Sequence, residues 1–113
     1  MEREALETLQ LERMKALLHT VYNKVDTYKQ KFDEIGFNPE DFNDLAQMSE
    51  LPFTVKDDLR AAYPYKMFAA PRKDIVRVHS SSGTTGQISV VGYTQNDLDM
   101  WSDCVARALS AAG

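Results

Sequence analysis

Apolar residues recur every three or four positions through the first 35 of 113 residues, and this repeat constrains the fold more than any other feature. The repeat comprises Leu6, Leu9, Met14, Leu17, Leu18, Val21, Tyr22, Val25, Tyr28 and Phe32. Such spacing predicts an amphipathic helix from about Glu4 to Ile35, ending at Gly36, with room for a break near Asn23–Thr27. An apolar face this long must be covered, either by the rest of the chain or by a second copy. The coiled-coil dimer is the rival interpretation, although the spacing is irregular and no clear charge pairing accompanies it.

Capping signals predict two shorter helices in the middle of the chain. Asn38 and Pro39 are typical of an N-cap and a first helical residue, and they predict a short helix that reaches Met48. The sequence Thr-Val-Lys-Asp at 54–57 indicates a second helix start with an acid in its first turn. That helix should end before Pro64. Residues 1–72 are therefore expected to form a helical region.

The last 40 residues indicate strands and a final helix. Ile75–Val78 and Ile88–Tyr93 are rich in β-branched residues and predict two strands, and Gly92 marks a bulge or a close approach by another group. Thr94, with Asp97 three residues on, predicts the capped start of a helix. The apolar face of that helix consists of Leu98, Trp101, Val105, Ala108 and Ala112.

Together these elements predict an α+β fold, with a strand–loop–strand–helix unit over residues 73–113. A chain of this length is one small domain at most. The single cysteine, Cys104, excludes a disulfide framework and a cysteine metal cluster, and is expected to be buried on the last helix. A net charge of −4, with scattered Lys and Arg, argues against nucleic-acid or anionic-membrane partners, and no apolar stretch reaches membrane-spanning length. We expect a cytoplasmic location.

Seven consecutive residues, Ser80–Gly86, are all Ser, Thr or Gly and lie between the two predicted strands. Glycines let a ligand approach the backbone closely, and exposed N–H groups with neighbouring hydroxyls form an anion-binding nest. Phosphate is the natural guest. The run is neither a Walker A loop nor a Gly-x-Gly-x-x-Gly fingerprint. Composition alone favours a phosphate site and a plain flexible hairpin loop about equally.

The run and its surroundings resemble a known family. Val78–Gly86 together with Val90–Thr94 resembles the phosphate-binding loop region of adenylate-forming ligases, and specifically that of the phenylacetate–coenzyme A ligase family. Further segments that resemble this family are Leu51–Arg60, Tyr63–Tyr65, Phe68–Ala69 and the helix carrying Trp101. The resemblance runs from about Leu9 to Gly113 and corresponds to roughly the first quarter of the family's usual length. The loop motif is common to the whole superfamily, whereas the flanking segments point to the phenylacetate branch.

The resemblance implies a two-step ligation. A carboxylate attacks the α-phosphate of ATP, giving an acyl-adenylate and pyrophosphate, and the thiol of coenzyme A then displaces AMP to give a thioester. The loop would hold the β- and γ-phosphates with Mg²⁺, through positioning and electrostatic stabilisation. The residues implied for this ATP-phosphate site are Ser81, Ser82, Gly83, Thr84, Thr85, Gly86 and Gln87. His79 would orient the loop by hydrogen bonding, and no catalytic or metal-ligating residue is expected in this chain.

One departure from the family pattern concerns charge beside the phosphates. The family usually has Lys-Pro after the second glycine, where this chain has Gln87-Ile88. Related ligases often carry a basic residue two positions further, where this chain has Ser89. Gln87 can donate a hydrogen bond but cannot neutralise an anion, so ATP affinity or adenylation rate should be lower than with lysine.

The resemblance also implies that the rest of the machinery lies outside this chain. The acid pocket, the adenine site and the catalytic lysine have no counterpart here, so the chain should be an inactive N-terminal part of the acyl-adenylating domain. In the parent enzyme the strands would join a larger α/β sheet. Exposed apolar faces would then favour a homo-oligomer of the isolated piece. The alternatives are a stand-alone phosphate- or nucleotide-binding module and a helical protein that dimerises through Leu6–Phe32.

Overall fold

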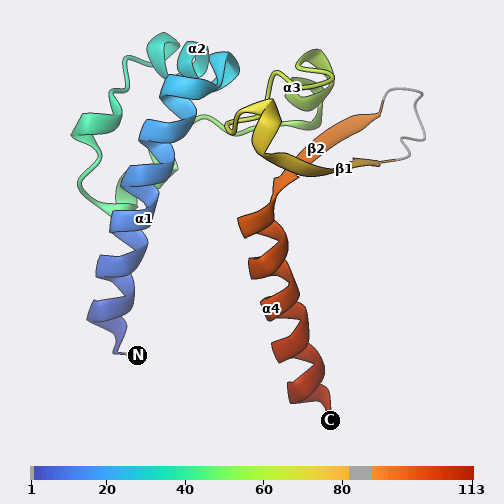
Figure 1. Ribbon diagram of the computed structural model, residues 1–113. Helices are drawn as coiled ribbons and strands as arrows, with labels where there is room; N and C mark the ends of the chain where they lie inside the picture. The colour runs from blue at the N-terminus through green and yellow to red at the C-terminus, as the bar shows by residue number, and fades with distance from the viewer. Residues whose placement is uncertain (1, 82–87) are drawn as a thin grey trace.

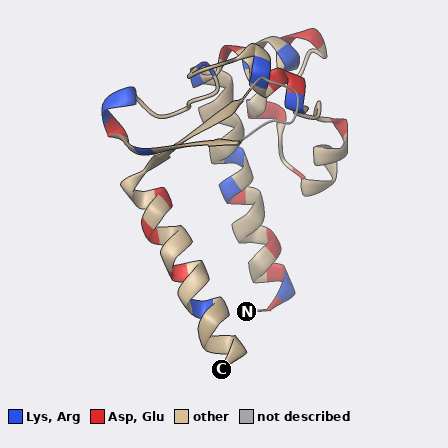
Figure 2. Ribbon diagram, turned by 90° about the vertical axis from the view of Figure 1, so that its right-hand side faces the viewer, with Lys and Arg blue, Asp and Glu red and all other residues tan. Residues whose placement is uncertain are grey.

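The computed structural model describes residues 2–81 and 88–113 and shows helices followed by a two-stranded hairpin and a long last helix (Figure 1). The elements in chain order are α1 (Arg3–Lys24), α2 (Asp26–Glu34), the 3₁₀ turns η1 (Pro39–Asp41) and η2 (Leu45–Glu50), α3 (Lys56–Ala61), the 3₁₀ turn η3 (Arg72–Asp74), β1 (Ile75–Ser81), β2 (Ser89–Thr94) and α4 (Gln95–Ala112). The predicted α+β class is therefore confirmed. Both termini lie at the same end of the molecule in both views (Figures 1 and 2).

The long amphipathic segment is broken at Val25, inside the predicted interval. Val25 has extended backbone angles and is almost fully buried, while its N–H still donates to the carbonyl of Val21 at 2.9 Å. This break ends α1 and starts α2, so that Leu18 and Phe32 face a common core with Phe42. The partly buried residues around that core are Leu11, Met14, Val21, Tyr22, Tyr28, Phe37 and Leu51. The inner part of the stripe is thus covered by the chain's own following segment.

The prediction of one helix from Pro39 to Met48 was wrong. Asn38 does cap a turn, since its side chain accepts the Glu40 N–H at 3.1 Å, but η1 stops at Asp41. Phe42 is completely buried and has extended backbone angles, which helical continuation does not allow. Burial of this ring therefore ends the turn, and Asp44 caps a second one by accepting the Ala46 N–H at 2.8 Å.

The helix start near residue 54 is confirmed, although Thr54 is not its cap. The Val55 N–H donates to the Asp58 carboxylate at 2.8 Å, and the Thr54 hydroxyl instead donates to the Tyr28 phenol at 2.8 Å. The side chain of Lys31 on α2 donates to the same Asp58 carboxylate at 2.9 Å. These bonds fasten α3 to α2, and α3 ends at Ala61, before the proline as predicted.

The hairpin extends further than the sequence pattern indicated on its first strand. Strand β1 reaches Ser81, three residues beyond the predicted end, because it pairs antiparallel with β2 up to Ser81 opposite Ser89. The register shifts between Ile75 and Arg77. The predicted close approach at Gly92 is also confirmed, as a Cβ built there would lie 2.5 Å from the Phe68 ring.

Helix α4 begins with the predicted cap. Thr94 accepts the Asp97 N–H through its hydroxyl at 3.3 Å, and the Asp97 carboxylate accepts the Thr94 N–H at 2.8 Å. The helix then extends away from the hairpin (Figure 1). Its predicted apolar face has little cover, and Leu109 is 68% exposed. The expectation that Cys104 is buried was wrong for the same reason, because no described element packs over this part of α4.

Candidate functional site

The hairpin includes the start of the Ser/Thr/Gly run. Ser80 and Ser81 are the last residues of β1, paired with Val90 and Ser89 respectively, and both are exposed. Of the predicted phosphate-site residues, the structure thus places Ser81 at the tip of a strand. The other six, Ser82, Gly83, Thr84, Thr85, Gly86 and Gln87, lie outside the described residues.

Ser81 and Ser89 face each other across the two strands. The Ser89 N–H donates to the Ser81 hydroxyl oxygen at 3.4 Å, a long bond by the standards of N–H···O geometry. Ser89 is the one buried polar residue among those described, at 8% exposure. The strand ladder therefore fixes both flanks of the run close together, which is what a loop that surrounds an anion requires.

His79 lies in an aromatic cluster rather than in a described hydrogen bond. Its ring centroid is 5.0 Å from that of Tyr93 and 5.8 Å from that of Trp101, edge-on to both. Tyr93 and Trp101 stack on each other at 5.6 Å. The three rings come from β1, β2 and α4. Sequence reasoning singled out His79 but did not predict this cluster. The sequence feature that could have indicated it is the presence of aromatic residues on both sides of the predicted helix cap.

The capping pair also sets local electrostatics. The backbone N–H of Thr94 and then its hydroxyl hold the pKa of the Asp97 carboxyl below its ordinary value, because both donate to the ionised form. Because its carboxylate accepts both of these hydrogen bonds, Asp97 stabilises the N-terminus of α4. The carboxylate therefore anchors the hairpin-to-helix junction rather than offering itself to a ligand.

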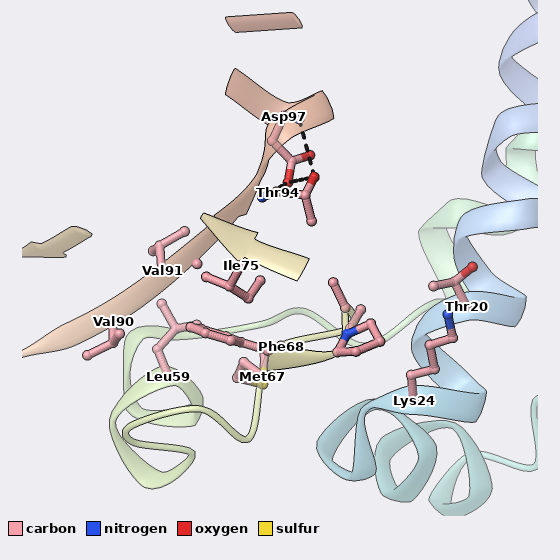
Figure 3. Close-up of a pocket in the computed structure, with 14 residues that line it drawn as sticks. Thr20, Lys24, Leu59, Met67, Phe68, Ile75, Val90, Val91, Thr94 and Asp97 are labelled. Atoms are coloured by element: carbon pink, nitrogen blue, oxygen red, sulfur yellow. Dashed lines mark hydrogen bonds between the residues drawn. The ribbon is translucent and has the colours of Figure 1, made fainter. Parts of the chain in front are cut away.

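A groove of about 500 Å³ lies beside β2 and the start of α4 (Figure 3). Apolar side chains dominate its wall, and Figure 3 shows Phe68, Met67, Leu59, Ile75 and Val90 gathered there. Lys24 and Thr20 reach it from α1. Sequence reasoning missed this groove apart from the close approach at Gly92, because the groove arises where segments far apart in sequence meet.

Two classes of site are not seen in residues 2–81 and 88–113. No group of three or more His, Cys, Asp or Glu side chains there could hold a metal ion. Along the same residues, no helix combines the length and the apolar character that crossing a membrane requires. Lys and Arg are spread over several elements rather than gathered on one (Figure 2).

The comparison with proteins of known function decides the relationship. The chain is 49% identical to phenylacetate-coenzyme A ligase of Escherichia coli (strain K12) over 110 residues, which is 97% of this chain. It is 50% identical over 110 residues to the enzyme of the same name from Pseudomonas putida. A relative of that name from Thermus thermophilus is 50% identical over 111 residues. The chain is a homologue of the phenylacetate-coenzyme A ligases.

The homology covers only part of each ligase. This chain spans 25% of the length of these relatives. No family model matches it. The predicted kinship with phenylacetate–coenzyme A ligases is nevertheless confirmed, since near-half identity extends over almost every residue of the chain.

Solved structures agree with the sequence comparison. The chain matches 2-hydroxyisobutyryl-CoA ligase, in complex with 2-HIB-AMP and CoA in the thioesterification state, with a TM-score of 0.77 and 28% identity. The match covers 86% of this chain and 22% of that one. An open conformation of the same ligase matches with a TM-score of 0.75 and 25% identity. The fold is thus that of part of a larger CoA ligase.

Proposed function

We propose that this chain is the ATP-phosphate-binding part of an acid–thiol ligase. The observation that carries the proposal is near-half identity to phenylacetate-coenzyme A ligases over 97% of the chain. The complete protein would activate an aryl acid with ATP and transfer the acyl group to coenzyme A. The acid is inferred from the names of the relatives, since the implied acid pocket has no counterpart in this chain.

The chemistry divides into two displacements. A carboxylate oxygen of the acid attacks the α-phosphorus of ATP, the bond to the bridging oxygen breaks, and pyrophosphate leaves. The thiolate of coenzyme A, having lost its proton, then attacks the acyl carbon, and AMP leaves with the bonding electrons. This chain would contribute to the first step only, by stabilising the charge that builds on the departing phosphates.

The binding roles are assigned to the run that the hairpin carries. Hydroxyls of Ser81, Ser82, Thr84 and Thr85 would donate to the β- and γ-phosphates, and Gly83 and Gly86 would let the backbone N–H groups approach. Support for these roles comes from the flanks of the run, which the strand ladder holds together at Ser81 and Ser89. Mg²⁺ would arrive with the phosphates, since its sites commonly combine substrate phosphate oxygens with several waters and one or two carboxylates, and no step is assigned to it.

The helical-dimer alternative lacks support from the core. Leu18 and Phe32, both members of the stripe that would form the dimer, are 4% and 2% exposed within a single chain. The binding-module alternative shares the phosphate site and differs only in whether the complete protein performs chemistry. Thioester formation from ATP, coenzyme A and an aryl acid by the complete protein would decide that point.

The binding role can be tested on the chain itself by calorimetric titration with Mg–ATP and with inorganic pyrophosphate. We expect Gly83→Ala and Gly86→Ala to weaken binding of both ligands, because an added methyl group keeps the phosphates from the backbone. Ser102→Ala is the control, since Ser102 is exposed on α4 and lies outside the Ser/Thr/Gly run. Unchanged affinity in both loop variants would exclude the phosphate role.

The missing lysine offers a test in the opposite direction. Gln87→Lys should strengthen pyrophosphate binding by roughly 0.5–2 kcal/mol, the scale of a partly screened charge-assisted contact. The gain should shrink as salt is added, because screening weakens the new ion pair. Titrations at two ionic strengths measure both effects. An affinity equal to that of the parent chain at low salt would contradict the proposed placement of the phosphates.

A further inference from the structure

The aromatic cluster of His79, Tyr93 and Trp101 joins three elements at one point. Each ring contacts both of the others, at centroid separations between 5.0 and 5.8 Å. Tyr93 and Trp101 are nearly parallel, at 26°, while His79 meets them edge-on at 62° and 69°. These are the arrangements that aromatic quadrupoles favour. The cluster is therefore a defined joint between β1, β2 and α4.

The joint lies next to the end of β1. His79 is two residues before Ser81, so their side chains lie on the same face of the strand. The hydrogen bond described at Ser81 itself is the long 3.4 Å contact from Ser89. The strand ladder pairs Ser81 with Ser89, and the packing of His79 adds a further restraint on the direction in which β1 delivers its last residues.

Helix α4 supplies the fixed side of the joint. Its first turn is tied to β2 by the bonds between Thr94 and Asp97, at 2.8 Å from backbone N–H to carboxylate. Trp101 lies about one turn after Asp97 and gives the helix a second attachment to the hairpin. Trp101 is 46% exposed, and its described ring contacts are with His79 and Tyr93.

We propose that Trp101 is a positioning residue for the phosphate site and acts through the ring of His79. The inference rests on the proposed function and adds a residue that lies twenty positions beyond Ser81. The indole holds the imidazole edge-on, and the imidazole holds the end of β1, so the first serine of the site is presented in one direction. Trp101 itself touches no phosphate.

The affinity test uses inorganic pyrophosphate and Mg²⁺ with the 113-residue chain. Trp101→Leu, which keeps an apolar side chain but no ring, should weaken pyrophosphate binding roughly 3- to 10-fold, as expected for losing aromatic pair contacts. Trp101→Phe should recover much of the loss. Val105→Ala is the matched control, since Val105 is one turn on, equally exposed at 46%, and is in none of the ring contacts.

A double-mutant cycle tests whether Trp101 acts through His79. His79→Ala should weaken binding about as much as Trp101→Leu, and the double variant should bind no more weakly than either alone. Additive losses would overturn the proposal, because independent residues add. The same variants are heated under circular dichroism. If the affinity of Trp101→Leu falls only as its folded fraction falls, the role is structural and the proposal fails.

Emission from Trp101, the only tryptophan in the chain, gives a readout that stability does not move. Pyrophosphate should change this emission in the parent chain and in Val105→Ala, and should not do so in His79→Ala at saturating ligand. Failure of the parent chain to bind pyrophosphate at all would overturn the proposed function and this inference together. Binding by the parent chain, with Trp101→Leu binding equally well, would overturn this inference alone.

Discussion

At the scale of single residues, Gly92 leaves no room for a side chain beside the Phe68 ring. A Cβ at position 92 would lie 2.5 Å and 2.7 Å from two carbons of the Phe68 ring. The Phe68 ring also packs edge-on against Tyr65, with ring centroids 5.4 Å apart. Glycine here is required by space rather than by backbone angle.

Gly92→Ala is therefore expected to destabilise the chain by about 1–3 kcal/mol, the usual cost of overpacking a filled site. Urea denaturation followed by circular dichroism measures the loss. The cost should be much smaller in a Phe68→Leu background, where the ring edge is absent. Equal costs in the two backgrounds would show that the Phe68 ring is not what opposes the methyl group.

The Asp58 carboxylate has two partners, the Val55 N–H and the Lys31 ammonium, and their effects on its pKa differ. The Val55 N–H first, and the Lys31 ammonium second, hold the pKa of the Asp58 carboxyl below its ordinary value. Asp58→Ala removes both partners and should destabilise the chain more than Lys31→Met, which leaves the cap of α3 intact. Urea midpoints rank the two variants. A larger loss in Lys31→Met would mean that the ion pair outweighs the cap.

At the scale of elements, the box formed by Thr94 and Asp97 decides where β2 ends and α4 starts. Thr94→Ala should cost about 0.5–2 kcal/mol, the range for removing an N-cap side chain. The pKa of Asp97 is lowered in the folded chain, so its carboxylate contributes stability above the unfolded pKa and loses it as pH falls through the folded pKa.

The corresponding pH experiment compares thermal midpoints of the parent chain and Asp97→Asn. The difference should be constant at neutral pH and should vanish once the pH has fallen below the lowered pKa of Asp97 in the folded chain. Asp99→Asn is the control, as Asp99 accepts one exposed bond from Gln95 at 2.8 Å and caps nothing. A difference that persists in acid would show that Asp97 acts through its shape and not through its charge.

Elements with a local signal were the ones that the sequence predicted well. The Thr94 cap, the break near Val25 and the end of α3 before Pro64 depend on neighbours within a few residues, and all three are confirmed. Phe42 shows what such reasoning misses. Its burial against Leu18 and Phe32 is a tertiary event, and it replaced a predicted helix with two 3₁₀ turns.

The candidate site divides in the same way. The composition of the Ser/Thr/Gly run and the strands around it were readable from sequence, and the pairing of Ser81 with Ser89 confirms the strand flanks. The aromatic joint was not readable, because His79 and Trp101 are 22 positions apart and meet only once the start of α4 packs against the hairpin. The phosphate role itself stays a prediction.

At the scale of the whole molecule, the apolar surface is buried around α1 and α2 but stays exposed on α4. The core built by α1, α2 and the segment after them is closed, with Phe42 completely buried. By contrast, α4 has no buried residue, and the two-stranded sheet described has β1 and β2 only. Because this chain spans 25% of the length of its relatives, such an asymmetry is what a part of a larger sheet-containing domain would show.

An uncovered helix face should drive self-association of the chain when it is alone in solution. Trp101, Val105 and Leu109 follow one face of α4, with exposures of 46%, 46% and 68%. Sedimentation velocity over a dilution series should therefore reveal association that increases with concentration. Leu109→Lys should shift the population towards monomer, because burying an unpaired ammonium in the contact is costly.

Ser110→Lys is the matched control, since it adds the same charge one residue away, outside the row formed by Trp101, Val105 and Leu109. Ser110 is exposed and its hydroxyl donates to the carbonyl of Ala106, at 2.8 Å. If both lysine variants dissociate equally, net charge and not the apolar face governs assembly. If Leu109→Lys alone dissociates, the apolar face of α4 is the contact.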